Sequence, residues 1–179
     1  FLVKGSNEDA TMFSSLKEGL IKISFFVAYI YIISLMNDIK RVFQYHGAEH
    51  KSIFAYEKGL ELTVDNVKKM PRLHPRCGTN FIFVVLMVST FVFSFFTFEN
   101  VLTRSILKLI FFPVVAGIAY EIIKIAGKYQ NPFTRVLILP GLLMQKITTR
   151  EPDEKQIEVA IAALQATLDK TEVVSPSPT

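Results

Sequence analysis

Three long apolar runs alternate with polar segments along this chain, and they lie at residues 20–36, 80–98 and 105–126. The second run carries no charged side chain between Phe81 and Phe98. At a rise of about 1.5 Å per residue, a helix of this length crosses the roughly 30 Å hydrocarbon layer of a bilayer. The pattern therefore predicts a mainly α-helical, polytopic membrane protein with about three transmembrane helices.

The polar segment between the first two runs, residues 37–79, carries many basic side chains, whereas residues 99–105 carry only Arg104. Its lysines and arginines are Lys40, Arg41, Lys51, Lys58, Lys68, Lys69, Arg72 and Arg76. Because basic loops remain on the cytoplasmic side of a membrane, we expect residues 37–79 to form a cytoplasmic helical insertion. The third helix would then return the C-terminus to the cytoplasm.

The N-terminal residues 1–19 would lie on the extracytoplasmic side and connect to an upstream span. The chain starts with Phe1 instead of a methionine, and it lacks the basic, apolar and small-residue succession that is typical of a signal peptide. We therefore interpret the sequence as the interior of a longer protein.

Residues 127–150 follow the third run and contain a shorter apolar stretch at residues 133–144. This stretch is too short to span a bilayer, and it includes the helix-weakening pair Pro140 and Gly141. The pattern predicts an interfacial or re-entrant segment.

An amphipathic pattern predicts a cytoplasmic helix at residues 151–170. Asp153 and Gln156 have the spacing of a capping box at its start. The apolar positions recur on one stripe and are Ile157, Ile161, Leu164 and Leu168. We expect this stripe to dock on the rest of the domain or on a neighbouring subunit. Residues 171–179 lack such a pattern and are predicted to be disordered.

The composition supports membrane insertion. Of the residues, 50% are hydrophobic, 16 are phenylalanine and none is tryptophan, and the mean hydropathy is +0.35. A net charge of +4 would suit nucleic acid, but the basic residues lie beside apolar runs rather than in an aromatic-interleaved patch. We therefore expect the lipid bilayer as a partner and no nucleic acid. A single cysteine excludes an intramolecular disulfide.

All histidines and the only cysteine fall within residues 46–77, and they are His46, His50, His74 and Cys77. Nitrogen and sulfur donors of these types bind transition metals, so a divalent metal site with zinc as the ion is the first hypothesis. His46 and His50 are four residues apart, which puts both rings on one face of a helix. With Glu49 they match the H-x-x-E-H pattern, in which the glutamate is the general base beside zinc.

The number of ligands would decide the chemistry. If His74 and Cys77 both bind, four protein ligands close the site, which is then structural. If only one of them binds, a water can occupy the fourth position and attack a carbonyl or phosphoryl centre. The sequence leaves these alternatives open. Arg76 is either one of the cytoplasmic basic residues or an anchor for a phosphate or carboxylate of the substrate.

The same residues have structural interpretations. His46 and His50 suit a solvated helix beside the membrane that holds no metal. Cys77 suits a small buried position under the second apolar helix. His74 suits a loop residue that is hydrogen-bonded to the backbone.

Glu121 lies inside the third apolar run, where an ionised side chain is costly. Such a residue often marks a proton or ion path through a membrane. The structural alternative is an ion pair with Lys124 or Lys128, one to two helical turns further along the chain.

Four strings of the sequence together resemble the YqhQ-like family. They lie at residues 43–51 (Phe-Gln-Tyr-His-Gly-Ala-Glu-His-Lys), 72–79 (Arg-Leu-His-Pro-Arg-Cys-Gly-Thr), 148–153 and 156–161. The similarity extends from Phe13 to Leu168. Members are bacterial integral membrane proteins of unknown function that are predicted to be metal-dependent enzymes.

This resemblance implies a multi-pass protein of the bacterial inner (plasma) membrane. It also implies a metal role for His46, Glu49, His50, His74 and Cys77. Members of the family are longer and begin with a Gly-rich segment that holds an acidic residue, which this sequence does not show. If that segment contributes a ligand, the present chain holds only part of the site.

The first functional hypothesis is a metal-dependent membrane enzyme of the hydrolase type, with its zinc site at the cytoplasmic face. Glu49 would be the base and Arg76 the substrate anchor. The alternative is a non-enzymatic homo-oligomeric membrane protein, either a channel or an assembly scaffold, with a structural metal or a histidine cluster. A scaffold would recruit a soluble partner through the helix at residues 153–168. The substrate is not identified by the sequence.

Overall fold

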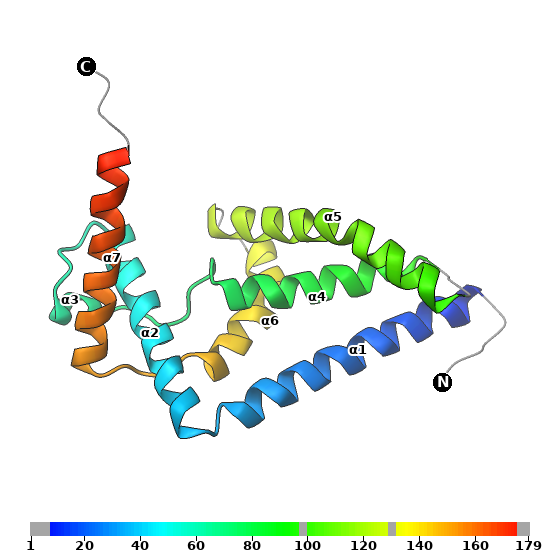
Figure 1. Cartoon of the computed structure of the whole chain (residues 1–179), viewed down its shortest axis with the longest axis horizontal. Coiled ribbons are helices and arrows are strands. Elements are labelled where there is room, and N and C mark those ends of the chain that lie inside the picture. Colours follow the sequence, from blue (N-terminus) through cyan, green and yellow to red (C-terminus); the bar gives the residue numbers. More distant parts are fainter. Residues whose placement is uncertain (1–7, 97–99, 129–131, 175–179) are drawn as a thin grey trace, which may run out of the picture. The chain divides into compact units, whose positions relative to one another are not determined.

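The computed structural model describes residues 8–96, 100–128 and 132–174, and these residues form seven helices and no strand (Figure 1). The helices are α1 (Glu8–Ile33), α2 (Asn37–Glu57), α3 (Val64–Lys68), α4 (Gly78–Ser94), α5 (Val101–Lys128), α6 (Pro132–Thr148) and α7 (Glu154–Val174). The prediction of a mainly helical protein is therefore confirmed.

The helices divide between two compact units. We call Phe1–Ile30 with Pro75–Met144 the apolar unit, because it contains α4, α5 and most of α1. We call Tyr31–His74 with Gln145–Thr179 the histidine unit, since all three histidines of the chain belong to it.

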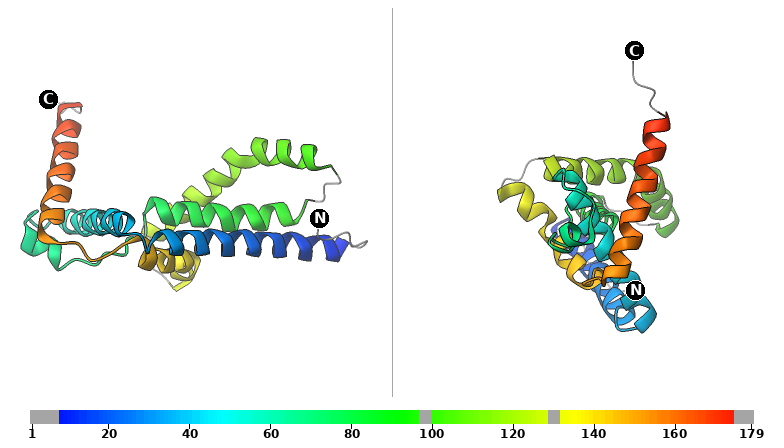
Figure 2. Two further views of the ribbon diagram at one scale, coloured as in Figure 1. Left: turned by 60° about the horizontal axis from the view of Figure 1, so that its bottom comes forward. Right: turned by 90° about the vertical axis from the view of Figure 1, so that its left-hand side faces the viewer.

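In the apolar unit, α4 and α5 lie side by side (Figures 1 and 2). Their contact buries Val84 of α4 against Ala119 and Ile123 of α5, and the small side chain of Ala119 lets the helices approach closely. Pro113 lies inside α5, where it removes one backbone hydrogen bond, and the helix bends along its length (Figure 2).

α1 approaches α4 at a glycine of the same unit. A Cβ atom added to Gly19 would lie 1.9 Å from Thr90 Cγ2, so only a residue without a side chain fits here without a shift. At the neighbouring position, the Glu18 carboxylate forms an ion pair with Arg104 of α5. This close approach and this ion pair connect α1 to both other long helices of the apolar unit.

Among the described residues, α5 is the one helix that is long and apolar enough by itself to cross a membrane. α1 meets this standard only when it is joined to α2 across the break after Ile33, and α4 is apolar but has 17 residues. The expected bounds also differ, because α1 begins at Glu8 and includes part of the expected N-terminal connection, and α4 ends at Ser94. The three membrane spans thus remain a prediction.

α6 is a continuous helix, although residues 127–150 were expected to be interfacial or re-entrant. Pro140 lies inside it, and Gly141 packs against Asn80 in the first turn of α4. A Cβ atom on Gly141 would lie 1.5 Å from Asn80 Oδ1, and Asn80 Nδ2 donates a hydrogen bond to Pro75 O at 2.7 Å. The chain is therefore helical at the Pro-Gly pair, where local preference indicated a break, and a tertiary contact is made at the same place. The placement of this segment at a membrane surface remains a prediction.

In the histidine unit, α7 packs on α2 and α3. The core of this unit consists of Ala48, Ala55, Val67, Ile157 and Ile161. The two alanines are on α2, and their small side chains let the apolar stripe of α7 approach the helix. The stripe therefore docks on helices of the same chain, as one of the two sequence alternatives stated.

The start of α7 has the expected capping box. Asp153 Oδ1 accepts a hydrogen bond from Gln156 N at 2.9 Å, and Gln156 Oε1 accepts one from Asp153 N at 2.9 Å. Nearby, the exposed side chains of Lys68 on α3 and Glu154 on α7 form an ion pair at 2.8 Å. Its hydrogen bond and charge raise the pKa of the Lys68 ammonium and lower the pKa of the Glu154 carboxyl.

The C-terminal helix is longer than expected. α7 continues to Val174, so residues 171–174 are helical and that part of the disorder prediction is wrong. Extending an existing helix by a few residues gains one hydrogen bond per residue without a new nucleus, which favours continuation. Residues 175–179 lie outside the described part of the chain.

We predict that Asp153→Ala lowers the free energy of unfolding of the chain by about 1 kcal/mol, because the first turn of α7 loses its cap. Chemical denaturation in detergent, followed by circular dichroism, measures this change. Asp169→Ala is the matched control, since it removes an exposed aspartate near the other end of α7, where a negative charge is unfavourable. An equal loss in both variants would contradict the role of the cap.

Candidate functional site

His46 and His50 lie one turn apart on α2, and their side chains come together. The ring centroids are 4.4 Å apart in an edge-to-face arrangement, and one ligand atom of each ring lies within 4.8 Å of the other. His50 is buried, and His46 is half-buried. The helix therefore places both imidazoles on one face, in agreement with their four-residue spacing.

Each of these two rings bonds to a backbone carbonyl through the same nitrogen. His46 Nδ1 lies 2.8 Å from Thr148 O, and His50 Nδ1 lies 2.6 Å from Arg72 O. A carbonyl oxygen only accepts, so Nδ1 of each ring carries the proton and donates it. In the neutral imidazole, this tautomer leaves the lone pair on Nε2.

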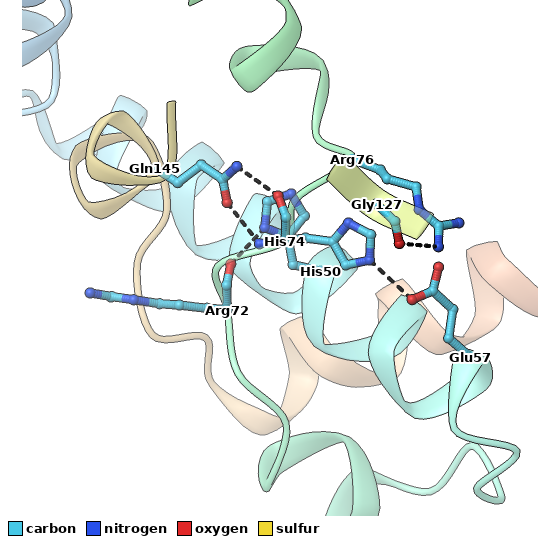
Figure 3. Close-up of polar contacts among 7 residues, drawn as sticks. All are labelled: His50, Glu57, Arg72, His74, Arg76, Gly127 and Gln145. Atoms are coloured by element: carbon cyan, nitrogen blue, oxygen red, sulfur yellow. Dashed lines mark hydrogen bonds and ion pairs between the residues drawn. The ribbon is translucent and has the colours of Figure 1, made fainter. Parts of the chain in front are cut away.

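His74 is also buried, and its backbone is bonded in both directions by the side chain of Gln145 (Figure 3). His74 N donates to Gln145 Oε1 at 2.8 Å, and Gln145 Nε2 donates to His74 O at 2.7 Å. The imidazole points toward Glu57, with 3.3 Å between His74 Nε2 and Glu57 Oε2, and it packs on Phe54. The ring of His74 thus faces a carboxylate of α2, with its centroid 5.8 Å from that of His50.

Cys77 belongs to the apolar unit, where it is the N-cap residue of α4. Its side chain is buried, and Sγ accepts a hydrogen bond from Thr79 N at 3.4 Å. In the same unit the exposed side chain of Arg76 donates from Nη2 to Gly127 O at 3.4 Å (Figure 3). The buried position of Cys77 at the start of α4 supports its structural interpretation, and the binding roles of Cys77 and Arg76 stay predictions.

Glu49 is exposed and lines a groove of about 310 Å³ between α2 and α7, beside Tyr45 and Ser52. Among the described residues, the group of potential metal donors that contains His46 and His50 does not include Glu49. Its expected role as a general base stays a prediction.

Glu121 on α5 forms an ion pair with Lys124, which is the structural alternative that the sequence indicated. Its Oε1 lies 3.2 Å from Lys124 Nζ, three residues further along the helix, and both side chains are more than half exposed. This ion pair accounts for the acidic residue within the apolar run. An ion path at this position is not needed to explain it.

Gly47 and Lys51 were not predicted as important residues. A Cβ atom on Gly47 would lie 2.1 Å from Arg150 O, so the segment after α6 crosses α2 at this glycine. Arg150 N donates to Phe43 O at 2.8 Å and holds the segment in place. Lys51 is 4% exposed, and its Nζ donates to Lys68 O at 3.0 Å and to the carboxylate of Glu151.

A signal for Lys51 was present in the sequence. It lies three residues after Ala48 and four before Ala55, so a helical projection puts it on the buried face of α2 together with these alanines. No comparable signal existed for Gln145, because its partner is the distant backbone of His74.

These features define a helical protein in which the histidine-bearing helix α2 bonds to two irregular segments. One of them lies around Arg72, and the other comprises residues 149–153. The chain belongs to the family described as "Protein of unknown function (DUF1385)", which matches residues 1–170. It is 42% identical over 152 residues to "Uncharacterized protein YqhQ" of Bacillus subtilis (strain 168). The alignment covers 84% of this chain and 48% of that relative, so the chain spans about half the length of the protein it matches. The expected YqhQ-like membership is therefore confirmed. No solved structure matches the chain.

We predict that Gly47→Ala destabilises the chain by about 1–3 kcal/mol, because the added methyl group would meet the fixed carbonyl of Arg150. Gly117→Ala on α5 is the control, since no neighbouring atom lies within 4 Å of its Cβ position. The control is expected to be neutral or slightly stabilising, because alanine favours helix. Thermal unfolding in detergent compares the variants, and equal midpoints would contradict the close approach at Gly47.

Proposed function

We propose that this chain is part of a metal-binding protein of the bacterial inner membrane, with α1, α4 and α5 as bilayer-crossing helices. α5 supports the membrane assignment by its length and apolarity. The neighbouring helix α4 and the chain's resemblance to integral membrane proteins extend the proposal to three spans. The basic residues of 37–79 favour a cytoplasmic histidine unit and a cytoplasmic C-terminus.

The bonds of His46 and His50 to backbone carbonyls carry the metal part of the proposal. Histidines that bind metals commonly donate the second ring N–H to a carbonyl, which fixes the tautomer and orients the ring. Two rings on one helical turn, each with Nε2 as the lone-pair atom, supply two nitrogen donors of the type that zinc binds.

Cys77 is the proposed third donor. His74 Nε2 already contacts the carboxylate of Glu57, which occupies the outer nitrogen of that ring. Cys77 follows His74 by three residues, so the chain keeps their Cα atoms within about 10 Å of each other. With His46 and His50, Cys77 would complete a set of two nitrogen donors and one sulfur donor, which is a ligand set that zinc takes.

The proposed activity is metal-dependent hydrolysis. Zinc with three protein ligands retains an open coordination position and supplies Lewis-acid chemistry for attack on a carbonyl or phosphoryl group. The residues of this chain would hold the ion and orient the imidazoles through Thr148 O and Arg72 O.

The same hydrogen bonds favour a second candidate, a non-enzymatic membrane protein. His46 connects α2 to the last residue of α6, and His50 connects it to the irregular segment around Arg72, so a closed site or a metal-free histidine cluster would stabilise the histidine unit. Four protein ligands at the metal would support this candidate, and three would support the enzyme.

We predict that the full chain, purified without chelator, contains about one zinc ion per molecule and that His46→Asn with His50→Asn removes it. The amide nitrogen of asparagine can replace Nδ1 as the donor to Thr148 O and Arg72 O, whereas nothing replaces Nε2. Zinc content is measured by elemental analysis, and thermal unfolding in excess chelator checks that the variant remains folded.

Three further variants test the donor set. Glu49→Gln and His74→Asn should retain zinc, and Cys77→Ser should reduce its occupancy about tenfold or more, since loss of a thiolate ligand weakens a zinc site strongly. Unchanged zinc in the double histidine variant would exclude the metal site.

We predict that a reporter enzyme that is active only outside the cytoplasm works when it is fused after Asn100 and fails when it is fused after Lys128. The reason is that α4 and α5 would cross the membrane in opposite directions. Equal activity of the two fusions would refute this topology. Extraction of the chain from membranes by alkaline carbonate would refute its integral insertion.

A further inference from the structure

The apolar unit contains a cavity of about 570 Å³ between the start of α4 and the C-terminal half of α5. Its lining combines three cationic side chains with three apolar or aromatic ones. They are Arg76, Lys124 and Lys128, and Phe81, Tyr120 and Ile123. A cavity with such a lining fits an amphipathic anion.

Arg76 is positioned at this cavity by α5. Its side chain crosses the backbone at Gly127, where an added Cβ atom would lie 2.6 Å from Arg76 Nε. Nη2 donates to Gly127 O, so the guanidinium lies at the C-terminal end of the helix (Figure 3). A side chain at position 127 would displace the arginine, and the glycine therefore makes room for it.

Lys124 and Lys128 add charge at the same cavity. They are four residues apart on α5, so their like charges lie on one helical face and repel each other. The C-terminal end of a helix attracts cations, which accounts for a part of this clustering. The carboxylate of Glu121 pairs with Lys124. Three cationic side chains therefore line the cavity, and Glu121 pairs with one of them.

The start of α4 adds positive electrostatic potential to the same cavity. Gly78 and Cys77 line the cavity, and the first turn of this 17-residue helix presents the positive end of its dipole there. Phe81 of α4 and Ile123 of α5 form an apolar wall beside these charges. The cavity thus combines phosphate-binding groups with a surface that suits hydrocarbon.

We propose that this cavity binds the phosphate headgroup of an anionic phospholipid, with the acyl chains along Phe81 and Ile123. Arg76 would bind two phosphate oxygens with its planar guanidinium, and the lysines would act as point charges. The inference rests on the membrane part of the proposed function and does not require the metal. Arg76 then has a ligand, as one sequence alternative stated.

Native mass spectrometry of the full chain, released from detergent that contains phosphatidylglycerol or phosphatidylcholine, tests the proposal. We expect the wild type to retain the anionic lipid about tenfold better than the zwitterionic one. Lys124→Gln with Lys128→Gln should abolish this preference, because two of the three cations are lost while the contact of Arg76 with Gly127 remains. Arg76→Lys should weaken the preference, since it keeps the charge and loses the bidentate geometry.

Lys40→Gln with Arg41→Gln is the matched control, because it removes two exposed basic residues of α2, in the histidine unit. It should leave the preference unchanged. Equal loss in both double variants, or equal retention of both lipids by the wild type, would overturn the proposal. Retention of inorganic phosphate without lipid preference would also overturn it and assign the cavity to a free anion.

Failure of the lipid site and failure of membrane insertion are distinguishable. Resistance of the chain to alkaline carbonate, together with absent lipid preference, would remove only the lipid site. Release of the chain by carbonate would remove the membrane assignment on which the lipid site depends.

Discussion

The histidine unit depends on one constraint, which is that partly buried backbone carbonyls need hydrogen-bond donors. α2 supplies these donors from a single face. His46 bonds to the carbonyl of Thr148, His50 bonds to that of Arg72, and Lys51 bonds to that of Lys68. Each carbonyl would cost about 1–3 kcal/mol if its partner were removed and no water replaced it. The two irregular segments therefore take their path from the side chains of this helix.

The structural and the chemical interpretations of the histidines use different atoms of the same rings. Nδ1 of His46 and His50 holds the irregular segments, and this bond directs the lone pair to Nε2. A ring whose orientation is already fixed loses little freedom when it binds an ion, which favours a metal site. The hydrogen bonds that stabilise the unit would thus also orient both rings for the proposed metal.

The elements that sequence patterns predicted well are those with local causes. α2 lies at the start of the helical segment that was expected at residues 37–79, and no proline interrupts it. The capping box of α7 needs only Asp153 and Gln156. α6 was not predicted as a helix, because Pro140 and Gly141 weaken helix locally while Gly141 packs on the distant Asn80. The boundary between the first apolar run and the next segment was expected after Met36, and α1 ends three residues earlier, at Ile33, although residues 34–36 contain neither proline nor glycine.

The sequence by itself determined the helical class, the apolar runs and the pairing of His46 with His50, because periodicity and spacing express these directly. The family followed from the resemblance of four motif strings. Only the tertiary structure decided three contacts. The backbone of Arg150 passes close to Gly47, the side chain of Gln145 bonds to the backbone of His74, and Glu49 lies in the groove between α2 and α7. These contacts join residues far apart along the chain. Their existence depends on how the helices pack, and no local pattern of polar and apolar residues encodes that packing.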